Sequence, residues 1–392
     1  MQHQLDALLT RDPAAMRVSE RDEFDRLSGG RQIVLMGAGG LGRRTLAGLR
    51  RHGIEPLAFA DNGKQGTTLD DIPVLSPEAA ARKFGGLAAF VVTIWGANRL
   101  HRFAHSREQL RALGCDVVCS FPPLFWKYAD PLLPFYLQDL PSKLLDDRAE
   151  VRRAFELWED EASRAEYVAQ VRFRLNADFD GLPHPVEHPQ YFPDDLYAWS
   201  DDEWIVDGGA YDGDSVRMVS SRYGGRFGHI LALEPDPANF SRLQATVAAL
   251  PPPVRAKVDC RQVALGSVRS TLHLDATGTA ASMTSVAASA GTIAVRAETL
   301  DCLVEGAIPT FVKLDIEGFE VDALEGGQQT IERHGPVLAV CVYHRQDHLW
   351  RIPLLLREWR DDYTFFLRPH NEEGWDLVCY AVPRGRLKVP GR

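Results

Sequence analysis

The chain has 392 residues, 45% of them hydrophobic, and a formal net charge of −10. This length allows two domains with sizeable cores, and the acidic balance argues against a general nucleic-acid or anionic-membrane binder. No apolar run reaches the length of a membrane span, and charges throughout the first thirty positions argue against a secretory signal. Six scattered cysteines without a CxxC pair favour reduced thiols, so we expect a cytoplasmic protein.

A glycine-rich turn follows the first predicted strand, which covers residues 33–36. The G-x-G-x-x-G spacing, between that strand and an amphipathic helix, falls on Gly37, Gly39 and Gly42. Such a turn lets the backbone approach a pyrophosphate, and the helix start offers free amides. The next strand, in EPLAFAD, ends at Asp61, about where a carboxylate would accept ribose hydroxyls. A tight turn that binds nothing is an equally open interpretation.

The stretch FADNGKQGTTLDDIPVLSPEAA resembles nucleotide-sugar-binding Rossmann domains of bacterial sugar-modifying enzymes, and the resemblance covers residues 30–120. It implies a nucleotide or nucleotide-sugar ligand rather than a hydride-transfer cofactor. We therefore predict a Rossmann-like domain over residues 1–125.

Residues 126–200 are predicted to form a helical connector. Helix formers dominate residues 142–175, and the apolar stripe of Leu145, Val151, Phe155 and Trp158 has helical spacing. A proline-rich loop follows, and Tyr191 and Phe192 within it are candidates to cover a ligand of the next domain.

A second glycine turn opens residues 201–392. The strand at 204–206 leads into VDGGAYDGDS, and a second strand ends at Glu234, which can accept ribose hydroxyls. Asp207 would repel a phosphate at this turn, so a cationic ligand suits it better than a pyrophosphate. The two glycine turns are thereby predicted to bind ligands of different charge.

Several ordered motifs resemble the FkbM family of S-adenosylmethionine-dependent O-methyltransferases over residues 190–384: VDGGAYDGDS, ALEPDPANF, CRQVALGS, AETLDCL, FVKLDIEGFEVDALEGG and VYHRQDHLW. The resemblance implies an α/β protein with two Rossmann-like domains. The second has the class I methyltransferase fold, a seven-stranded sheet with a terminal antiparallel hairpin. It also implies S-adenosylmethionine as cofactor, bound by Asp207, Gly208, Gly209, Ala210, Tyr211, Gly213, Glu234 and Asp236, with Val263 and Ala264 beside the adenine. Core packing is the alternative for the last two.

The motif FVKLDIEG alternates apolar residues with Lys313, Asp315 and Glu317, which predicts three charges on one face of a strand. In the implied fold this strand lies beside the first strand of the domain, and His344 ends the next one. We expect His344 or Asp315 to act as general base, with Glu317 and Lys313 setting the local field.

Other interpretations of these residues stay open. Lys313 and Glu317 can form a simple ion pair, and His344 can be a core histidine. A metal held by His344 and His348, or by Asp315 and Glu317, lacks an evident further ligand, so metal dependence is undetermined.

The predicted acceptor is a small molecule or glycan precursor, methylated on a hydroxyl. Ser282, Arg368 and His370 are candidates to contact it. Alternatives are a nucleotide-sugar oxidoreductase or epimerase that uses the first glycine turn, and a non-catalytic ligand sensor. No nucleic-acid or membrane partner is expected, and a homo-oligomer is compatible with the sequence.

Overall fold

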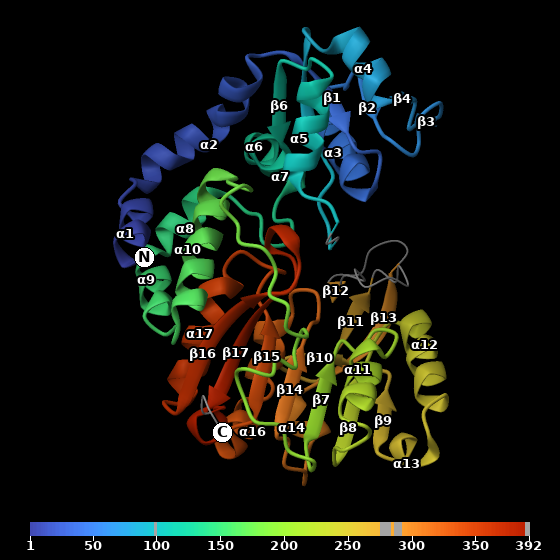
Figure 1. The fold of residues 1–392 in the computed structure, drawn as a ribbon, viewed down its shortest axis with the longest axis vertical. Coiled ribbons are helices and arrows are strands. Elements are labelled where there is room, and N and C mark those ends of the chain that lie inside the picture. The colour runs from blue at the N-terminus through green and yellow to red at the C-terminus, as the bar shows by residue number, and fades with distance from the viewer. Residues whose placement is uncertain (98–99, 275–283, 286–291, 389–392) are drawn as a thin grey trace.

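The computed structural model describes residues 1–97, 100–274, 284–285 and 292–388, and it has a mixed α/β fold (Figure 1). A six-stranded sheet lies at the top of Figure 1 and a seven-stranded sheet at the bottom, with helices α8–α10 to one side. Ser282 lies outside the described residues. Within these residues, no helix is long and apolar enough to cross a membrane.

The upper sheet has the strand order β3-β4-β2-β1-β5-β6. All neighbouring strands run parallel except β3, which is antiparallel to β4. The central strands are buried apolar runs, as expected where helices cover both faces of a parallel sheet. The elements are β1 (Gln32–Met36), α3 (Gly40–Arg51), β2 (Ala58–Ala60), β3 (Thr68–Leu69), β4 (Ile72–Leu75), α4 (Pro77–Phe84), β5 (Ala88–Val92), α5 (Phe103–Ala112) and β6 (Val117–Ser120).

The first two helices, α1 (Gln2–Leu9) and α2 (Pro13–Ser28), pack on the connector as well as on the upper sheet. Asp12 caps α2 and Gly29 ends it in the left-handed conformation. The connector helices are α6 (Phe121–Lys127), α7 (Ala129–Leu132), α8 (Pro141–Asp146), α9 (Arg148–Phe155) and α10 (Glu161–Asn176). Because α1 contacts α9 and α10, the start of the chain packs against helices that lie beyond the predicted boundary at 125. The boundaries at 125 and 200 stay a prediction.

The lower sheet has the strand order β16-β17-β15-β14-β7-β8-β9, parallel except for the pairings of β17. Its strands are β7 (Trp204–Gly208), β8 (His229–Leu233), β9 (Val258–Arg261), β14 (Phe311–Leu314), β15 (Val337–Cys341), β16 (Tyr363–Pro369) and β17 (Leu377–Pro383). The helices are α11 (Asp214–Arg222), α12 (Pro237–Ala248), α13 (Pro252–Arg255), α14 (Leu300–Leu303), α15 (Glu320–Glu325), α16 (Gln328–His334) and α17 (His348–Trp359), with short 3-10 turns η1 (Glu372–Gly374) and η2 (Arg384–Arg386).

A smaller sheet, β10-β13-β11-β12, lies beside the large one. Its strands are β10 (Ala264–Leu265), β11 (Ser270–Leu274), β12 (Thr284–Ser285) and β13 (Ile293–Glu298).

Parallel pairing brings the carboxyl ends of β7, β8, β14 and β15 to one edge of the large sheet. In the register of β14 against β7, Lys313 is opposite Asp207. β14 ends at Leu314, so Asp315 and Glu317 lie in the loop that follows. The predicted row of three charges on one strand face is therefore wrong, because the strand stops after the first of them.

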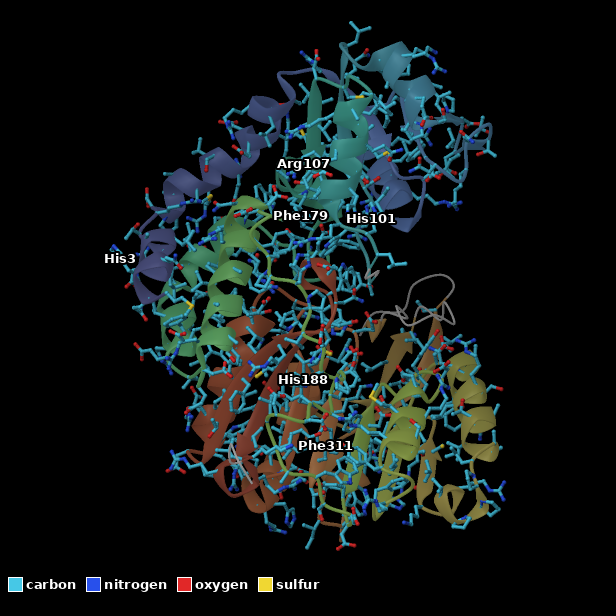
Figure 2. All side chains as sticks on the ribbon, in the orientation of Figure 1. His3, His101, Arg107, Phe179, His188 and Phe311 are labelled. Carbon is cyan, nitrogen blue, oxygen red and sulfur yellow. The ribbon has the colours of Figure 1, made fainter. Side chains whose placement is uncertain are left out.

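The upper domain also contacts the connector loop and the β16–β17 hairpin. Arg107 pairs with Asp180 at 2.6 Å, and Phe103 and Phe179 have ring centroids 5.1 Å apart; Figure 2 labels Arg107 and Phe179 at this junction. Trp95 Nε1 donates to the Glu373 carbonyl at 3.2 Å, and the Trp95 and Trp375 rings lie 4.7 Å apart. These contacts place the hairpin turn against the upper domain.

Candidate active site

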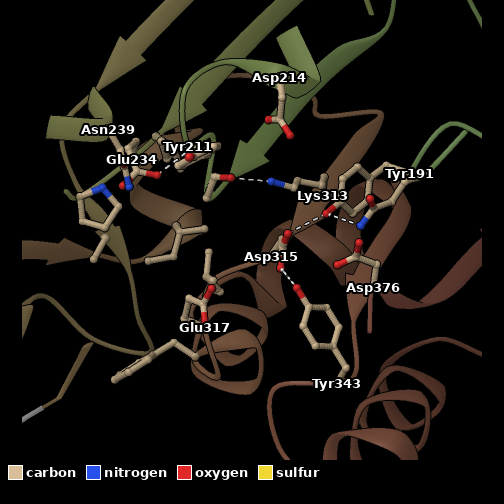
Figure 3. Close-up of a pocket in the computed structure, with 18 of the residues that line it drawn as sticks. Tyr191, Tyr211, Asp214, Glu234, Asn239, Lys313, Asp315, Glu317, Tyr343 and Asp376 are labelled. Atoms are coloured by element: carbon tan, nitrogen blue, oxygen red, sulfur yellow. Dashed lines mark hydrogen bonds between the residues drawn. The ribbon is translucent and has the colours of Figure 1, made fainter. Parts of the chain in front are cut away.

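A cavity of about 430 Å³ opens at the carboxyl ends of the large sheet (Figure 3). Ala97 reaches it from the upper domain, and Tyr136, Gln190 and Tyr191 from the connector region. The remaining lining residues are Gly209, Tyr211, Asp214, Leu233, Glu234, Pro235, Asn239, Val263, Ala264, Leu265, Lys313, Asp315, Ile316, Glu317, Phe319, Tyr343, Trp375 and Asp376. All three parts of the chain therefore build one cavity.

The first side of the cavity is formed by the turn after β7. Gly209 has φ +75°, and a Cβ there would lie 1.9 Å from the Asp315 carbonyl oxygen, so only glycine allows this close approach. Val263 and Ala264 line the same side, and so do Asp214 and Asn239. This side therefore combines a glycine turn and small apolar side chains with the carboxylate of Asp214.

Glu234 directly follows β8 and holds the turn in place. Its two carboxylate oxygens accept the N–H groups of Tyr211 and Asp236, each at 2.9 Å. Burial raises the pKa of Glu234 to about 7, and these hydrogen bonds offset only part of that effect. A buried carboxylate that lines a cavity and titrates near neutrality is favourable for binding hydroxyl donors.

Four of the predicted cofactor residues shape the turn and do not line the cavity: Gly208, Ala210, Gly213 and Asp236. Gly213, at φ +86°, precedes α11, and Asp236 caps α12 by accepting the N–H groups of Ala238 and Asn239. Direct ligand contact by these four is not supported by the geometry.

Asp207 and Lys313 form a buried ion pair beneath the turn. The Lys313 Nζ lies 3.0 Å from Asp207 Oδ1 and donates to the Gly209 carbonyl at 2.6 Å. Burial alone would lower the pKa of Lys313, but the Asp207 and Asp315 carboxylates outweigh it and raise the pKa. Asp207 does not line the cavity, so the predicted contact with a cationic ligand is replaced by this pair. The alternative Lys313–Glu317 ion pair is wrong, because Lys313 is committed to Asp207.

Asp315 lies at the centre of the second side of the cavity. Its Oδ2 accepts the Tyr191 hydroxyl at 2.7 Å and its Oδ1 accepts the Tyr343 hydroxyl at 3.2 Å (Figure 3). His344 Nε2 lies 3.4 Å from Oδ1. The carboxylate is therefore held in one orientation at the cavity wall.

Two further carboxyl groups face this side. Burial raises the pKa of Glu317 to about 8, which the nearby His344 lowers only in part, and Glu317 has a left-handed backbone with φ +55°. Burial, with a further contribution from Asp315, raises the pKa of Asp376 to about 6. Left-handed backbone at a residue other than glycine is a mark of functional sites, and here it directs Glu317 to the cavity.

His344 is buried behind the cavity and does not line it. Its Nδ1 lies 2.8 Å from Glu320, whose other oxygen lies 3.1 Å from His348 Nδ1. Burial would lower the pKa of His344, but Glu320 and Glu317 outweigh it and raise the pKa to about 10. An imidazole that is already protonated near neutral pH cannot accept a proton, so this geometry opposes the predicted role as general base. His344 and His348 face Glu320, and the described residues contain no group of three or more metal-ligating side chains.

Two of the predicted substrate residues lie away from the cavity. Arg368 is buried and pairs with Asp160 on the N-terminal side of α10, at 2.5 Å. His370 is buried, with Nε2 2.8 Å from the Tyr380 hydroxyl. Neither residue lines the cavity, because β16 packs against α10. The third candidate, Ser282, lies outside the described residues.

The first glycine turn borders a separate cavity of about 390 Å³, lined by residues that include Gly37, Gly39, Asp61, Lys64 and Glu373. Gly42 does not line it; a Cβ there would meet the Gly37 carbonyl oxygen at 2.1 Å, so this glycine allows α3 to pack on β1. Asp61 accepts three backbone N–H groups, from Ala38, Gly63 and Lys64. Its carboxylate primarily holds its own loops together.

The sequence analysis missed Ala97 and the aromatic and acidic residues that complete the main cavity: Tyr136, Asp214, Phe319, Tyr343, Trp375 and Asp376. Asp214 directly follows the last turn glycine, Gly213, so an acidic residue next to a turn glycine was a usable signal there. The others carry no local signal, because only tertiary packing brings them to the site.

The family comparison decides the kind of domain that forms this cavity. Residues 207–367 match the model of the Methyltransferase FkbM domain. This part of the chain is an FkbM methyltransferase domain. The match includes the turn after β7, Glu234 and the loop after β14, which form much of the cavity wall.

One solved structure is similar along nearly the whole chain. The crystal structure of methyltransferase FkbM from Methylobacillus flagellatus KT has a TM-score of 0.77 and 21% sequence identity, and the match covers 97% of each chain. At this identity the similarity shows the fold, and it extends across both large sheets.

A structure described as "putative rRNA-methylase" from Clostridium thermocellum has a TM-score of 0.31 and 8% identity, over 50% of this chain and 91% of that one, and supports no inference. No curated protein matches the sequence.

Proposed function

We propose that the protein is an S-adenosylmethionine-dependent O-methyltransferase that acts on a hydroxyl of a sugar, glycan precursor or related small molecule. The observation that carries the proposal is one cavity with two unlike sides. A glycine turn with Glu234 forms one side, and Asp315 with Glu317 forms the other. A cofactor and an acceptor bound in a single cavity would be held in contact, and such positioning supplies much of the rate of a displacement reaction.

The residues of the first side fit the cofactor. Glu234 would accept the ribose hydroxyls, Val263 and Ala264 would contact the adenine, and Gly209 with Asp214 would face the methionine end. When bound, the cofactor supplies an electrophilic methyl group on a positively charged sulfur. The carboxylates around the cavity favour that positive charge.

The second side suits a neutral, hydroxyl-rich acceptor. Carboxylates accept hydrogen bonds from hydroxyl groups, and aromatic rings cover the apolar face of a sugar. Asp315, Glu317 and Asp376 supply the first property, and Tyr136, Tyr343 and Trp375 the second. Lys313 is the single lysine or arginine among the lining residues, and Asp207 already neutralises it. An anionic reacting end would therefore be disfavoured.

Asp315 is the group that we assign to receive the acceptor proton. Tyr191 and Tyr343 donate hydrogen bonds to its two oxygens and fix its orientation, and His344 Nε2 lies 3.4 Å behind it. An alcohol is a weak nucleophile at neutral pH, so removing this base is expected to reduce turnover by roughly 10²–10⁴-fold. Glu317, beside it, is the second acidic group that an acceptor hydroxyl would meet.

Calorimetric titration with S-adenosylhomocysteine tests the cofactor assignment. We expect binding to the wild type, loss of binding in Glu234→Ala, and wild-type binding in the control Glu325→Ala, which removes an exposed glutamate. Absence of binding to the wild type would overturn the proposal. Turnover assays on sugar acceptors then compare Asp315→Asn with the same control, and wild-type turnover in Asp315→Asn would remove the base assignment.

We further propose that the cavity beside the first glycine turn binds a nucleotide or nucleotide-sugar. Three observations support this proposal. The cavity exists, the backbone of Gly37 and Gly39 lines it where a phosphate could approach, and the Lys64 side chain also lines it. Thermal-shift titration with UDP-sugars and NAD tests this: stabilisation by UDP-sugars supports it. A response to NAD alone, without S-adenosylhomocysteine binding, would favour the oxidoreductase alternative.

A further inference from the structure

Two opposite charges lie two residues apart at the cavity and are kept separate. The Lys313 ammonium and the Asp315 carboxylate both line the cavity, yet Lys313 turns to Asp207, 3.0 Å away. Opposite charges attract strongly in a partly buried site, and a lysine side chain is flexible enough to change partner. A group that contacts both side chains can therefore decide which carboxylate the ammonium keeps.

Tyr191 contacts both of them. Its hydroxyl donates to Asp315 Oδ2 at 2.7 Å, and the Lys313 Nζ lies 5.1 Å from the centre of its ring. Figure 3 shows Tyr191 beside both side chains, with its hydroxyl directed to Asp315. A ring at this distance attracts the ammonium to its face while the hydroxyl takes the carboxylate.

The connector loop holds Tyr191 firmly in this place. The residue has a left-handed backbone at φ +67° and is 4% exposed. Its N–H donates to the Tyr380 hydroxyl at 2.9 Å, and its carbonyl accepts the Tyr197 hydroxyl at 3.3 Å. Such a backbone conformation persists only where the surroundings impose it, so the ring position is fixed by the fold.

We propose that Tyr191 is a positioning residue that keeps the Lys313 ammonium on Asp207 and leaves the Asp315 carboxylate facing the acceptor. Without the ring, Lys313 would pair with Asp315, which would neutralise the base and leave Asp207 buried without its partner. The inference rests on the proposed function, because it concerns the charge that Asp315 presents beside the sulfonium.

The comparison of S-adenosylmethionine with S-adenosylhomocysteine tests this without knowledge of the acceptor. The two compounds differ at the sulfur, which is charged in the first and neutral in the second, so their affinity ratio reports the local charge. We expect Tyr191→Leu to weaken S-adenosylmethionine by about tenfold while S-adenosylhomocysteine stays within about twofold. Tyr191→Phe keeps the ring against Lys313 but removes the hydroxyl that holds Asp315. We therefore expect a smaller effect, in which the affinity for S-adenosylmethionine relative to that for S-adenosylhomocysteine falls by about threefold.

Tyr363→Phe is the matched control, because Tyr363 is a buried tyrosine whose hydroxyl donates to the Pro336 carbonyl, away from the cavity. Its ratio should equal that of the wild type. A crystal structure of Tyr191→Leu should place the Lys313 Nζ within hydrogen-bond distance of Asp315.

Equal weakening of both compounds, or an unchanged ratio in both Tyr191 variants, would overturn the inference and leave the proposed function intact. If the wild type binds neither compound, the proposed function fails and this inference fails with it. If Tyr191→Leu does not fold, the Tyr191→Phe ratio decides alone.

Discussion

The two glycine turns of this protein share one backbone hydrogen bond and differ in the charged residues around it. In each, a carboxylate at the end of the second strand accepts an N–H from the turn after the first strand. Asp61 accepts from Ala38 at 2.8 Å, and Glu234 accepts from Tyr211 at 2.9 Å. The difference lies around them: Asp61 is beside the exposed Lys64, whereas the second turn rests on the buried pair of Asp207 and Lys313.

The pKa values of the two carboxylates move in opposite directions. Burial would raise the pKa of Asp61, but three backbone N–H groups outweigh it and lower the pKa. For Glu234 burial dominates and raises the pKa to about 7. The glycine spacing therefore predicts the shape of a turn, and the buried charges beneath it determine which ligand it can accept.

The largest expected difference concerns the lysines of the two turns. Lys313→Met leaves Asp207 buried and unpaired, so we expect the free energy of unfolding to fall by about 3–5 kcal/mol. Lys64→Met removes an exposed charge and should change it by less than about 0.5 kcal/mol. Urea denaturation measures both.

The control is the double variant Lys313→Met, Asp207→Asn, which has no unpaired charge and should recover most of the loss. Equal effects of the two single variants would show that the Asp207–Lys313 pair does not distinguish the turns.

The second comparison substitutes one glycine in each turn. In Gly209→Ala the new Cβ would lie 1.9 Å from the Asp315 carbonyl oxygen at a residue with φ +75°. We expect a loss of about 2–3 kcal/mol in stability and loss of S-adenosylhomocysteine binding. A Cβ on Gly39 meets nothing within 4 Å, so Gly39→Ala should stay near the wild type in both measurements. Retained cofactor binding in Gly209→Ala would contradict the assigned close approach.

The third comparison uses pH. Because the pKa of Glu234 is raised from 4.5 to about 7 in the folded protein, the folded state binds more protons than the unfolded state between these values. Stability therefore falls as pH rises through this window, by about 3 kcal/mol from this group. Glu234→Gln should lack this fall. Denaturation curves measured from pH 4 to 8 test it, and parallel profiles of wild type and variant would refute the assignment.

The smallest expected effect is that of Asp61→Asn. Since the pKa of Asp61 is lowered, its contribution is fully present above the ordinary value of 3.8 and is lost as the pH falls below it. The group is partly solvated, so we expect Asp61→Asn to lower the free energy of unfolding by less than about 1 kcal/mol at pH 7. Below the ordinary pKa of 3.8, the stability of the variant should depend less on pH than that of the wild type. If Asp61 instead contributed a loss of stability between pH 4.5 and 7, as expected for Glu234, the proposed difference between the two turns would be refuted.

Local patterns in the sequence predicted much of the fold. Apolar runs located β1, β2, β7 and β8, and the glycine spacings located both turns, because these features depend on neighbouring residues. The mixed α/β fold and the FkbM methyltransferase domain are confirmed. The two-residue strand β3 and the strand β4 were missed, since short edge strands have little periodicity.

The site was predicted less completely, because its decisive contacts join distant segments. The partner of Lys313 is Asp207, 106 positions earlier, and neither residue indicates the other in the sequence. His344 was predicted at the right strand end, but its contact with Glu320, which makes it cationic, depends on how the loop after β14 folds back. Charge state at such positions follows from tertiary contacts and not from residue type.

Neighbouring residues of one loop serve two different cavities. Gly96 lines the cavity beside the first glycine turn, and Ala97 lines the main cavity. In the β16–β17 hairpin, Glu373 likewise lines the first of these cavities and Trp375 lines the main one. A truncated protein that begins at residue 201 would thus lose Ala97, Tyr136, Gln190 and Tyr191 from the wall of this cavity, along with the support of Trp95 against Trp375. The methyltransferase domain alone would consequently form an incomplete cavity. A fusion protein that uses this domain would have to include the first half of the chain as well.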